Sequence, residues 1–155
     1  MCLVIDTCCL AQVFCPANVC HSEFKPILNW ITNGKGRIIY GGTKYKKELK
    51  KARQIFKLLL ELRKVRKVIE LDTCEVDLKE KEIKNKESNP KFNDPHLVAI
   101  VIVSGCRVIC TLDKNSEEFI KNKKFYPKRF ARPKIYSKLK NKNLICSKNV
   151  TKICK

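Results

Sequence analysis

Short apolar runs alternate with longer amphipathic segments along this chain. Four runs, Cys2–Ile5, Arg37–Tyr40, Val65–Leu71 and Arg107–Thr111, are rich in apolar and β-branched residues, which is typical of strands buried in a parallel sheet. Helical spacing fills the intervals between them. This alternation predicts an α/β domain with a central parallel sheet and helices on both of its faces.

Several segments are predicted to be helical. They are Cys8–Phe14, Phe24–Ile31, Thr43–Arg66, a helix that follows Asp72, Leu97–Val103 and Ser116–Lys123. The longest has one apolar side, formed by Leu49, Ala52, Phe56, Leu59 and Leu60. Asp72 with Glu75 matches a capping box. Residues 79–91 are strongly charged and poorly periodic, which indicates a mobile surface segment.

The stretch from Asn93 to Asp113 combines a helix, a turn and a strand, with an acid at each outer end. Pro95 suits the first helical position, where no amide proton is needed, and Gly105 suits the left-handed residue that ends a helix. Asp94 could simply cap the helix, and Asp113 could be an ordinary turn residue. A chemical role requires that further acids converge on the same edge of the sheet.

The formal charge of the 155-residue chain is +19, from 34 Lys/Arg and 15 Asp/Glu. Residues 121–155 hold 13 of the basic residues and no acid, so residues 1–120 carry 34 − 13 = 21 basic and 15 acidic side chains, a net charge of +6. Such a balance favours a polyanionic partner, nucleic acid before membrane. We therefore expect a folded domain over 1–120 and a basic extension over 121–155, partly packed on that domain.

The ten cysteines do not follow a disulfide framework, because Cys8 and Cys9 are adjacent and Cys106 and Cys110 lie in or beside buried elements. The chain opens with too few apolar residues for a secretory signal, and no apolar run approaches the roughly 18 residues of a membrane span. These features predict a cytoplasmic protein with mostly reduced cysteines. Cys15, Cys20 and His21 are a weak zinc candidate.

Four acids are predicted to meet at one edge of the sheet: Asp6, Glu48, Asp94 and Asp113. Considered alone, Glu48 would be interpreted as forming a surface ion pair with Lys44 or Lys51. Together, four carboxylates repel one another and require a cation, and hard oxygen ligands suit Mg²⁺ or Mn²⁺. Two such ions can activate water and stabilise the leaving oxygen of a phosphodiester. An acidic metal site inside a basic protein is the layout of a metal-dependent nuclease.

These motifs resemble those of the PIN-domain nucleases. Leu3 to Thr7 is similar to the opening strand and first acid of that family, and Tyr45 to Leu49 to the helix with its second acid. Asn93 to Ala99 resembles the helix with the third acid, and Thr111 to Asp113 the strand end with the fourth. Glu117 falls near a further acid of some members, while Thr7 and Thr111 match hydroxyl residues that support the acids. Cys8 departs from the common Asn or Ser.

The resemblance implies a three-layer α/β/α sandwich that cleaves single-stranded or structured RNA with Mg²⁺ or Mn²⁺, with Asp6, Glu48, Asp94, Asp113 and Glu117 around the metal. Many members are toxins held by an antitoxin protein, and many form homodimers, so the expected role is that of such a toxin or of a defence nuclease. The sequence itself shows none of these three properties. Two alternatives stay open, a catalytically weak PIN scaffold that binds nucleic acid and a DNA nuclease.

Basic residues on two segments are the candidates for phosphate contacts. They are Lys44, Lys47 and Lys51 on the long helix, and Lys128, Arg129, Arg132, Lys138, Lys140 and Lys142 in the extension. Phe125, Tyr126, Phe130 and Tyr136 are interleaved with these charges and could stack on bases of a single strand. His96 is interpreted as a structural neighbour of the site.

Overall fold

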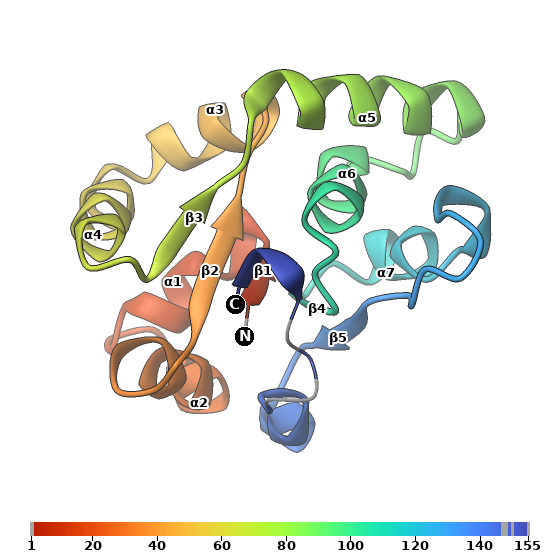
Figure 1. Cartoon of the computed structure of the whole chain (residues 1–155). Coiled ribbons are helices and arrows are strands. Elements are labelled where there is room, and N and C mark those ends of the chain that lie inside the picture. Colours follow the sequence, from red (N-terminus) through yellow and green to blue (C-terminus); the bar gives the residue numbers. More distant parts are fainter. Residues whose placement is uncertain (1, 147–148, 150, 155) are drawn as a thin grey trace.

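A parallel sheet of five strands forms the centre of the protein in a computed structural model (Figure 1). The structure describes residues 2–146, 149 and 151–154. The strands are β1 (Cys2–Ile5), β2 (Arg37–Tyr40), β3 (Val68–Glu70), β4 (Val108–Cys110) and β5 (Lys134–Tyr136). Their order is β3-β2-β1-β4-β5, and every neighbouring pair is parallel. The predicted α/β class with a central parallel sheet is confirmed.

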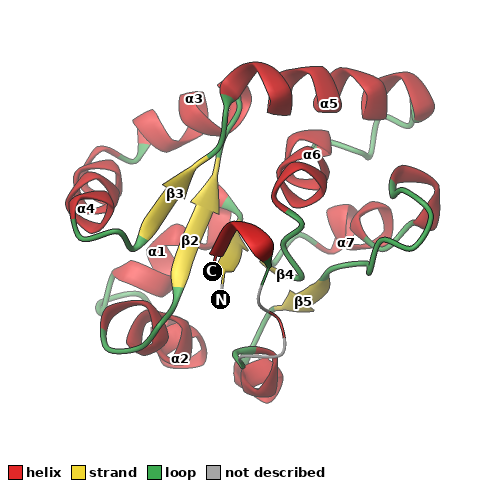
Figure 2. Ribbon diagram, viewed as in Figure 1, coloured by secondary structure: helices red, strands yellow, loops and turns green. Residues whose placement is uncertain are grey.

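Helices lie on both sides of the sheet, with α1 and α2 on one side and α5 and α6 on the other (Figures 1 and 2). The α-helices are α1 (Leu10–Phe14), α2 (His21–Thr32), α3 (Thr43–Lys51), α4 (Arg53–Lys64), α5 (Thr73–Lys86), α6 (Pro95–Ser104) and α7 (Lys114–Ile120). Short 3₁₀ helices are η1 (Thr7–Cys9), η2 (Lys123–Phe125), η3 (Leu139–Leu144) and η5 (Lys152–Cys154). Among the described residues, no helix has the length and apolar character needed to cross a membrane.

The core is built from the apolar runs that mark the strands. All residues of β1 and β4 are buried, and α6 is buried nearly all round, as its uninterrupted apolar sequence predicts. Gly105 ends α6 in the left-handed conformation, with φ 65°. β1, β4 and α6 are therefore the most enclosed elements of the domain. The loops that follow β1 and β4 start from these buried strands and are positioned by them.

The strand order reverses its direction between β1 and β4. The chain runs outward from β1 through β2 to β3, then returns across the sheet to place β4 on the other side of β1. In open parallel sheets, ligands bind in the crevice at the carboxyl ends of the two strands that flank such a reversal. Asp6 directly follows β1 and Thr111 directly follows β4, so both residues lie at the carboxyl ends of the two strands that flank the reversal.

The long helix predicted over Thr43–Arg66 is two helices, which is a correction. The break falls at Ala52, whose φ and ψ are −93° and 65°. Neither Gly nor Pro marks the break in the sequence. The physical reason is packing, because α3 buries Tyr45 and Leu49 while α4 turns to bury Ile55 and Leu59.

The charged segment predicted to be mobile over 79–91 is helical as far as Lys86. The N-terminal cap of α5 is Asp72, whose carboxylate accepts the amide of Glu75 at 2.8 Å. Val76 and Ile83 are buried against the domain, and α5 packs along α6. Two buried apolar residues two turns apart are enough to anchor the helix, although most of its other residues are charged.

Part of the basic extension is built into the sheet. Strand β5 pairs with β4 over three residues, with Ile109 opposite Ile135. Phe125, Tyr126 and Tyr136 are all buried, which removes them from contact with bases. Only Phe130 of the four aromatic candidates is partly accessible, and its ring stacks on Tyr126 at 5.3 Å between centroids. The interpretation of these side chains as a stacking platform is therefore wrong for three of the four.

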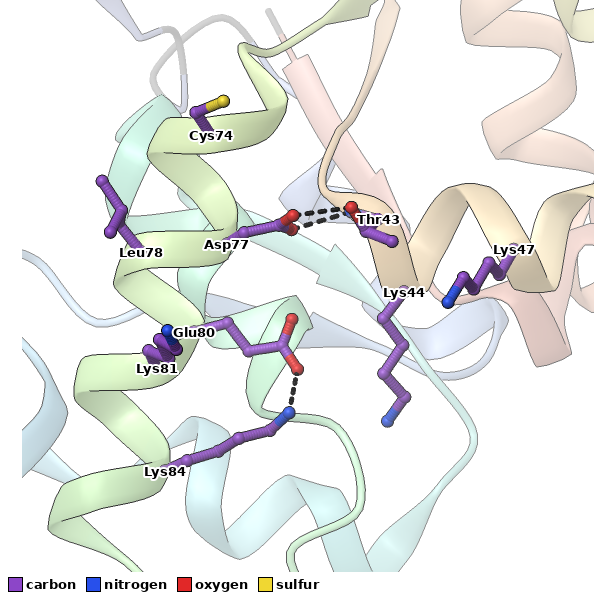
Figure 3. Close-up of a pocket in the computed structure, with 9 residues that line it drawn as sticks. All are labelled: Thr43, Lys44, Lys47, Cys74, Asp77, Leu78, Glu80, Lys81 and Lys84. Carbon is purple, nitrogen blue, oxygen red and sulfur yellow. Dashed lines mark hydrogen bonds and ion pairs between the residues drawn. The ribbon is translucent and has the colours of Figure 1, made fainter.

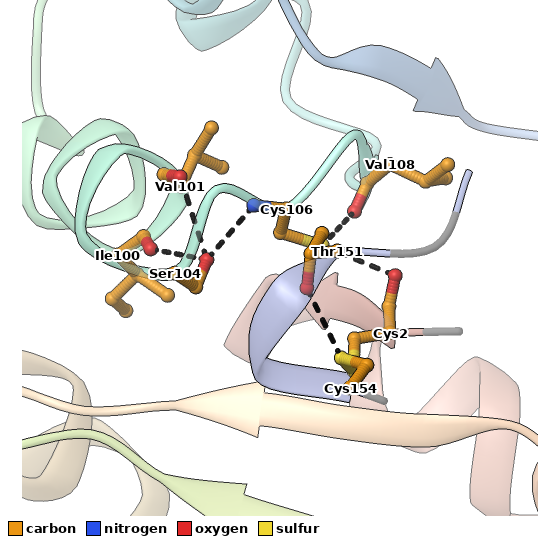
Figure 4. The surroundings of a disulfide bond; sticks show 8 residues. All are labelled: Cys2, Ile100, Val101, Ser104, Cys106, Val108, Thr151 and Cys154. Carbon is orange, nitrogen blue, oxygen red and sulfur yellow. Dashed lines mark hydrogen bonds between the residues drawn. A yellow bond between two sulfur atoms is a disulfide. The ribbon is translucent and has the colours of Figure 1, made fainter.

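A disulfide joins Cys2 in β1 to Cys154 in η5, with the two Cα atoms 6.0 Å apart (Figure 4). The Cys106 thiol lies beside it and donates to the carbonyl oxygen of Cys2 at 3.1 Å. The other eight cysteines are free, three of them buried, in keeping with the expectation that most are reduced. The pair escapes sequence patterns because its members are 152 residues apart.

Gly42 sets the start of α3 in a backbone conformation that other residues avoid. Its φ and ψ are 80° and 156°, and an added Cβ would lie 2.7 Å from Cγ1 of Val76. Gly105 also has positive φ, but an added Cβ there would meet nothing within 4 Å. Alanine at Gly105 would therefore cost only the free energy of an unfavourable backbone conformation, whereas alanine at Gly42 would add a steric clash with Val76.

We expect Gly42→Ala to lower the free energy of unfolding by roughly 3 kcal/mol or more, since strained backbone and overpacking add. Gly105→Ala should cost only about 1–2 kcal/mol, the backbone term alone. Urea unfolding of both variants measures the difference. Equal losses would contradict the assigned contact between Gly42 and Val76.

Candidate functional site

The anchor of α3 on the sheet brings Glu48 to the carboxyl end of β1. Tyr45 is fully buried, and its hydroxyl donates to the carbonyl oxygen of Ile5 at 2.6 Å. Glu48 lies three residues later on the same side of the helix. Its carboxylate accepts the hydroxyl of Thr7, which directly follows Asp6, at 2.8 Å.

A second hydroxyl holds Asp6. Thr111, at the end of β4, donates to Oδ2 of Asp6 at 2.7 Å, and both side chains are buried. The other oxygen of Asp6 accepts the amide of Cys8 at 3.3 Å. The Thr111 hydroxyl oxygen in turn accepts the amide of Asp113 at 3.1 Å. This one threonine therefore connects the first and fourth predicted acids.

A third hydroxyl, that of Ser116 in α7, lies between two carboxylates. It is 2.7 Å from Oδ2 of Asp94 and 2.9 Å from Oδ2 of Asp113. Because a hydroxyl has one hydrogen, it can donate to only one of the two at a time. In the sequence, Ser116 was expected only to begin a helix. Its position three residues after Asp113 was the available signal for a contact with that acid.

The side chain of Asp94 does not cap α6, although the residue is in the N-cap position. Its Oδ2 instead accepts the hydroxyl of Ser116, and its Oδ1 lies near Lys44 and His96. Burial raises the pKa of Asp94, and the negative charges of Asp6 and Glu48 raise it further, while the Ser116 hydroxyl and the Lys44 ammonium oppose the change. Capping of α6 therefore does not explain Asp94. What needs an explanation is a partly buried carboxylate placed near the negative charges of Asp6 and Glu48.

Asp113 uses its two carboxylate oxygens for different partners. Its Oδ1 accepts the amide of Asn115 at 2.8 Å and so caps α7, while Oδ2 faces Ser116. Burial acts to raise the pKa of Asp113, but the bonds from Ser116 and Asn115 outweigh it and lower the pKa. Asp94 and Asp113 therefore share one hydroxyl with their pKa values shifted in opposite directions.

His96 is the most unusual side chain of the region. It is 1% exposed, and neither ring nitrogen has a hydrogen-bond partner among the described residues. Nε2 lies 3.7 Å from a carboxylate oxygen of Glu48, and Nδ1 lies 4.0 Å from one of Asp94. Buried polar groups without partners are rare, so a ring placed between two carboxylates calls for a further group.

The imidazole of His96 is neutral at physiological pH. Burial lowers its pKa to about 3, and the positive charges of Lys44 and Lys84 lower it further. Its short distances to Glu48 and Asp94 are thus not ion pairs. A neutral imidazole offers a lone pair, which is the form that binds metal ions.

Glu48, Asp94 and His96 form a group able to bind a metal ion. Their ligand atoms all lie within 4.8 Å of one another. Ligands about 2.1–2.2 Å from one ion are at most about 4.4 Å apart, so small side-chain movements would close the group around a cation. In the part of the chain that the structure describes, no other set of His, Cys, Asp and Glu satisfies this criterion, and Cys15, Cys20 and His21 do not.

Asp6, Asp113 and Glu117 lie outside this three-residue group. Asp6 and Asp113 are tied to it through Thr111 and Ser116. Glu117 bonds to Lys121, one turn along α7. The sequence therefore located the neighbourhood of the group, whereas His96 was interpreted only as a neighbour. Its place two residues after Asp94 was the available signal.

A groove of about 670 Å³ lies between α3 and α5 and is here called the α3–α5 groove (Figure 3). Its lysines are Lys44, Lys47, Lys81 and Lys84. Its two acids are already bound, because Asp77 accepts the amide and hydroxyl of Thr43 and Glu80 pairs with Lys84 at 2.6 Å. Lys44 belongs both to this groove and to the surroundings of the acid cluster, since its ammonium group is 3.8 Å from Asp94.

The other predicted phosphate-binding residues are spread over the surface. Lys138 and Lys140 line a second groove, which begins at Thr111. Lys51, Lys128, Arg129 and Lys142 are exposed outside both grooves, and Arg132 donates to the carbonyl oxygen of Lys121 at 3.2 Å. Basic side chains thus approach the acids from α3 and α5 on one side and from η3 on the other.

Comparisons with protein-family models, with curated proteins and with solved structures found no match to this chain. The chemistry of the site has to be argued from its own geometry. That geometry is a cluster of carboxylates at a topological switch point, three hydroxyls that bond to them, and a buried histidine with two free nitrogens.

We expect Asp94→Asn to be at least as stable as the parent protein in the presence of a chelator, because the change removes one of several mutually repelling charges and no cap. In Mn²⁺, the parent should gain thermal stability by mass action and the variant should lose most of that gain. Asp72→Asn keeps the cap of α5 and should match the parent in both conditions. If Asp94→Asn costs more than about 1 kcal/mol in chelator, Asp94 stabilises the fold.

Proposed function

We propose that this protein is a PIN-like nuclease that hydrolyses phosphodiester bonds of RNA with a divalent metal ion. The observation that carries the proposal is His96, a buried neutral imidazole with two unpartnered nitrogens between the carboxylates of Glu48 and Asp94. A cation would offset the repulsion among the acids and would give the unprotonated ring nitrogen of His96 a partner. The net charge of +19 supports a polyanionic substrate.

Different residues would bind the metal ion and orient its ligands. Glu48, Asp94 and His96 would hold the ion, with Asp6 and Asp113 beside them. When bound, a divalent ion makes water a stronger nucleophile at neutral pH and stabilises charge on the phosphodiester oxygens. The hydroxyls of Thr7, Thr111 and Ser116 hold the carboxylates in fixed orientations, in the way that outer groups orient metal ligands.

Binding of the substrate would fall to the lysines around the acids. Lys44 lies between Asp94 and the α3–α5 groove, so its ammonium group can contact the phosphate nearest the metal. Lys47 and Lys81 have no ion pair among the described residues and are free to bind the next phosphates along one strand. This arrangement supports a nucleic-acid strand that enters the site along α3 and α5.

Of the two expected metals, the proposal favours Mn²⁺ over Mg²⁺. Mg²⁺ prefers oxygen ligands in near-ideal octahedral geometry, whereas a nitrogen ligand among carboxylates raises the relative affinity for later divalent ions. The antitoxin partner, the defence role and the homodimer implied by the PIN resemblance stay predictions. So does the choice of RNA over DNA.

The first test is cleavage of a labelled single-stranded RNA and its DNA counterpart with Mn²⁺, with Mg²⁺ and with a chelator. We expect hydrolysis only with metal, and a loss of orders of magnitude in Asp6→Asn and Asp94→Asn because each removes a charge from the cluster. Asp72→Asn, which alters a charge outside the cluster, should keep normal activity. Tight binding without hydrolysis under all metal conditions would instead favour the non-catalytic scaffold.

A second test addresses His96 directly and needs no activity. We expect His96→Leu to fold normally, since it replaces an unsatisfied polar ring with an apolar side chain of similar size. It should bind Mn²⁺ at least tenfold more weakly in calorimetry or electron paramagnetic resonance, while Mg²⁺ binding changes less. His21→Gln, at the other histidine of the chain, is the control. Unchanged Mn²⁺ affinity in folded His96→Leu would remove the histidine from the metal site.

A further inference from the structure

A second groove leaves the acids on the side opposite α3. It has a volume of about 600 Å³ and is here called the β4–β5 groove. It begins at Thr111 and Leu112, the two residues between β4 and Asp113, and its far wall is formed by β5 and η3. Because the Thr111 hydroxyl is bonded to Asp6, one end of the groove adjoins the acid cluster directly.

The charge of the β4–β5 groove is unbalanced. Four lysines line it, Lys114, Lys121, Lys138 and Lys140, against one acid, Glu117. That acid is already bonded to Lys121. The ammonium groups of the other three lysines have no hydrogen bond or ion pair within the described ranges of the chain. Three unneutralised cations around one hollow favour an anionic ligand.

The groove is not lined by charge alone. Leu112 is 41% exposed and Ile135 is half-buried, so an apolar surface is open between the lysines. Oδ1 of Asn141 accepts the amide of Ser137 at 3.2 Å and lies 3.3 Å from its hydroxyl. The side-chain nitrogen Nδ2 of Asn141 has no partner among the residues described, so it remains a free donor, whereas the backbone amide donates to the carbonyl oxygen of Lys138. An apolar surface, a free amide donor and clustered cations together match a base with its phosphate better than a phosphate alone.

We propose that the β4–β5 groove binds one nucleotide of the substrate, the one next to the phosphodiester held at the acid cluster. This inference rests on the proposed nuclease function and adds a subsite to it. Lys138 and Lys140 bind the phosphate, Leu112 and Ile135 contact the base, and Asn141 donates to its edge. The strand then passes from the α3–α5 groove across the acids into the β4–β5 groove, half of whose lining residues belong to the basic segment after residue 121.

The test measures binding in the presence of a chelator, so that no hydrolysis is needed. The probes are nucleoside 5′-monophosphates of the ribo and deoxyribo series, ribose 5-phosphate and a labelled single-stranded oligonucleotide. The proteins are the parent, Lys138→Gln/Lys140→Gln, Lys47→Gln/Lys81→Gln, Leu112→Ala and the control Lys25→Gln/Lys57→Gln. The control removes the same charge from exposed positions outside both grooves.

The mononucleotide should bind the parent protein, and Lys138→Gln/Lys140→Gln should weaken it on the order of tenfold at low salt. The control should leave mononucleotide affinity unchanged, and Lys47→Gln/Lys81→Gln should lower it by less than Lys138→Gln/Lys140→Gln does. Leu112→Ala should weaken the nucleotide but not ribose 5-phosphate. The oligonucleotide should lose affinity in both groove variants, with a log–log salt slope shallower by about 1.4 for two lost phosphate contacts.

Several results would overturn the proposal. They are absence of mononucleotide binding to the folded parent, equal losses in the two groove variants, or equal binding of nucleotide and ribose 5-phosphate. Hydrolysis without mononucleotide binding removes the subsite and leaves the nuclease standing. Mononucleotide binding without hydrolysis in any metal keeps the subsite and removes the nuclease. Comparison of the ribo and deoxyribo series separates an RNA ligand from a DNA ligand.

Discussion

The amide of Asp6 donates to the carbonyl oxygen of Cys110 at 2.8 Å, and this bond extends the pairing of β1 with β4 past the end of β1. The rest of the site depends on it. Once β1 and β4 are side by side, Thr111 can reach Asp6, and the segment after Thr111 delivers Asp113 and Ser116. Any slip in this pairing would separate acids that are more than 100 residues apart in the sequence, Asp6 and Asp113.

Electrostatics in this protein works at two ranges. Over the whole surface, a net charge of +19 attracts a polyanion. At the acid cluster, the negative charges of the carboxylates would repel a phosphate group of the same polyanion. Lys44 stands at the boundary, near Asp94 and within the α3–α5 groove. Burial lowers the pKa of His96, and the positive charges of Lys44 and Lys84 lower it further, so the surroundings of the ring favour the neutral form that can bind a metal ion.

The elements that could be predicted are those that the local sequence determines. Strands β1, β2 and β4 are short apolar runs, and α6 has both its Pro start and its Gly end in the sequence. The break at Ala52 was hidden because packing rather than Gly or Pro causes it. Helix α5 was underestimated because few of its residues are apolar, and β5 because it lies among charged residues.

For the site, strand ends indicated the positions of Asp6 and Asp113 and helix starts those of Glu48 and Asp94, but not the groups that hold them. The hydroxyl of Ser116 and the imidazole of His96 gain their meaning only from neighbours distant in sequence. The bonds to Thr7 and Thr111 had been suggested by the family resemblance alone. The pairing of Cys2 with Cys154 was equally out of reach, because no local pattern joins residues at that separation.

The two edges of the sheet bear on how copies of this chain can associate. Both edge strands, β3 and β5, are only three residues long. Glu70 in β3 is bound by Lys46 and Arg63, and β5 opens with exposed Lys134 directly after Pro133, which has no amide hydrogen to donate. Short, charged edges of this kind resist strand-to-strand joining between molecules. Self-assembly through a continuous sheet, and the fibrous aggregation that can follow from it, is thus disfavoured, and a dimer would have to form through the helical faces.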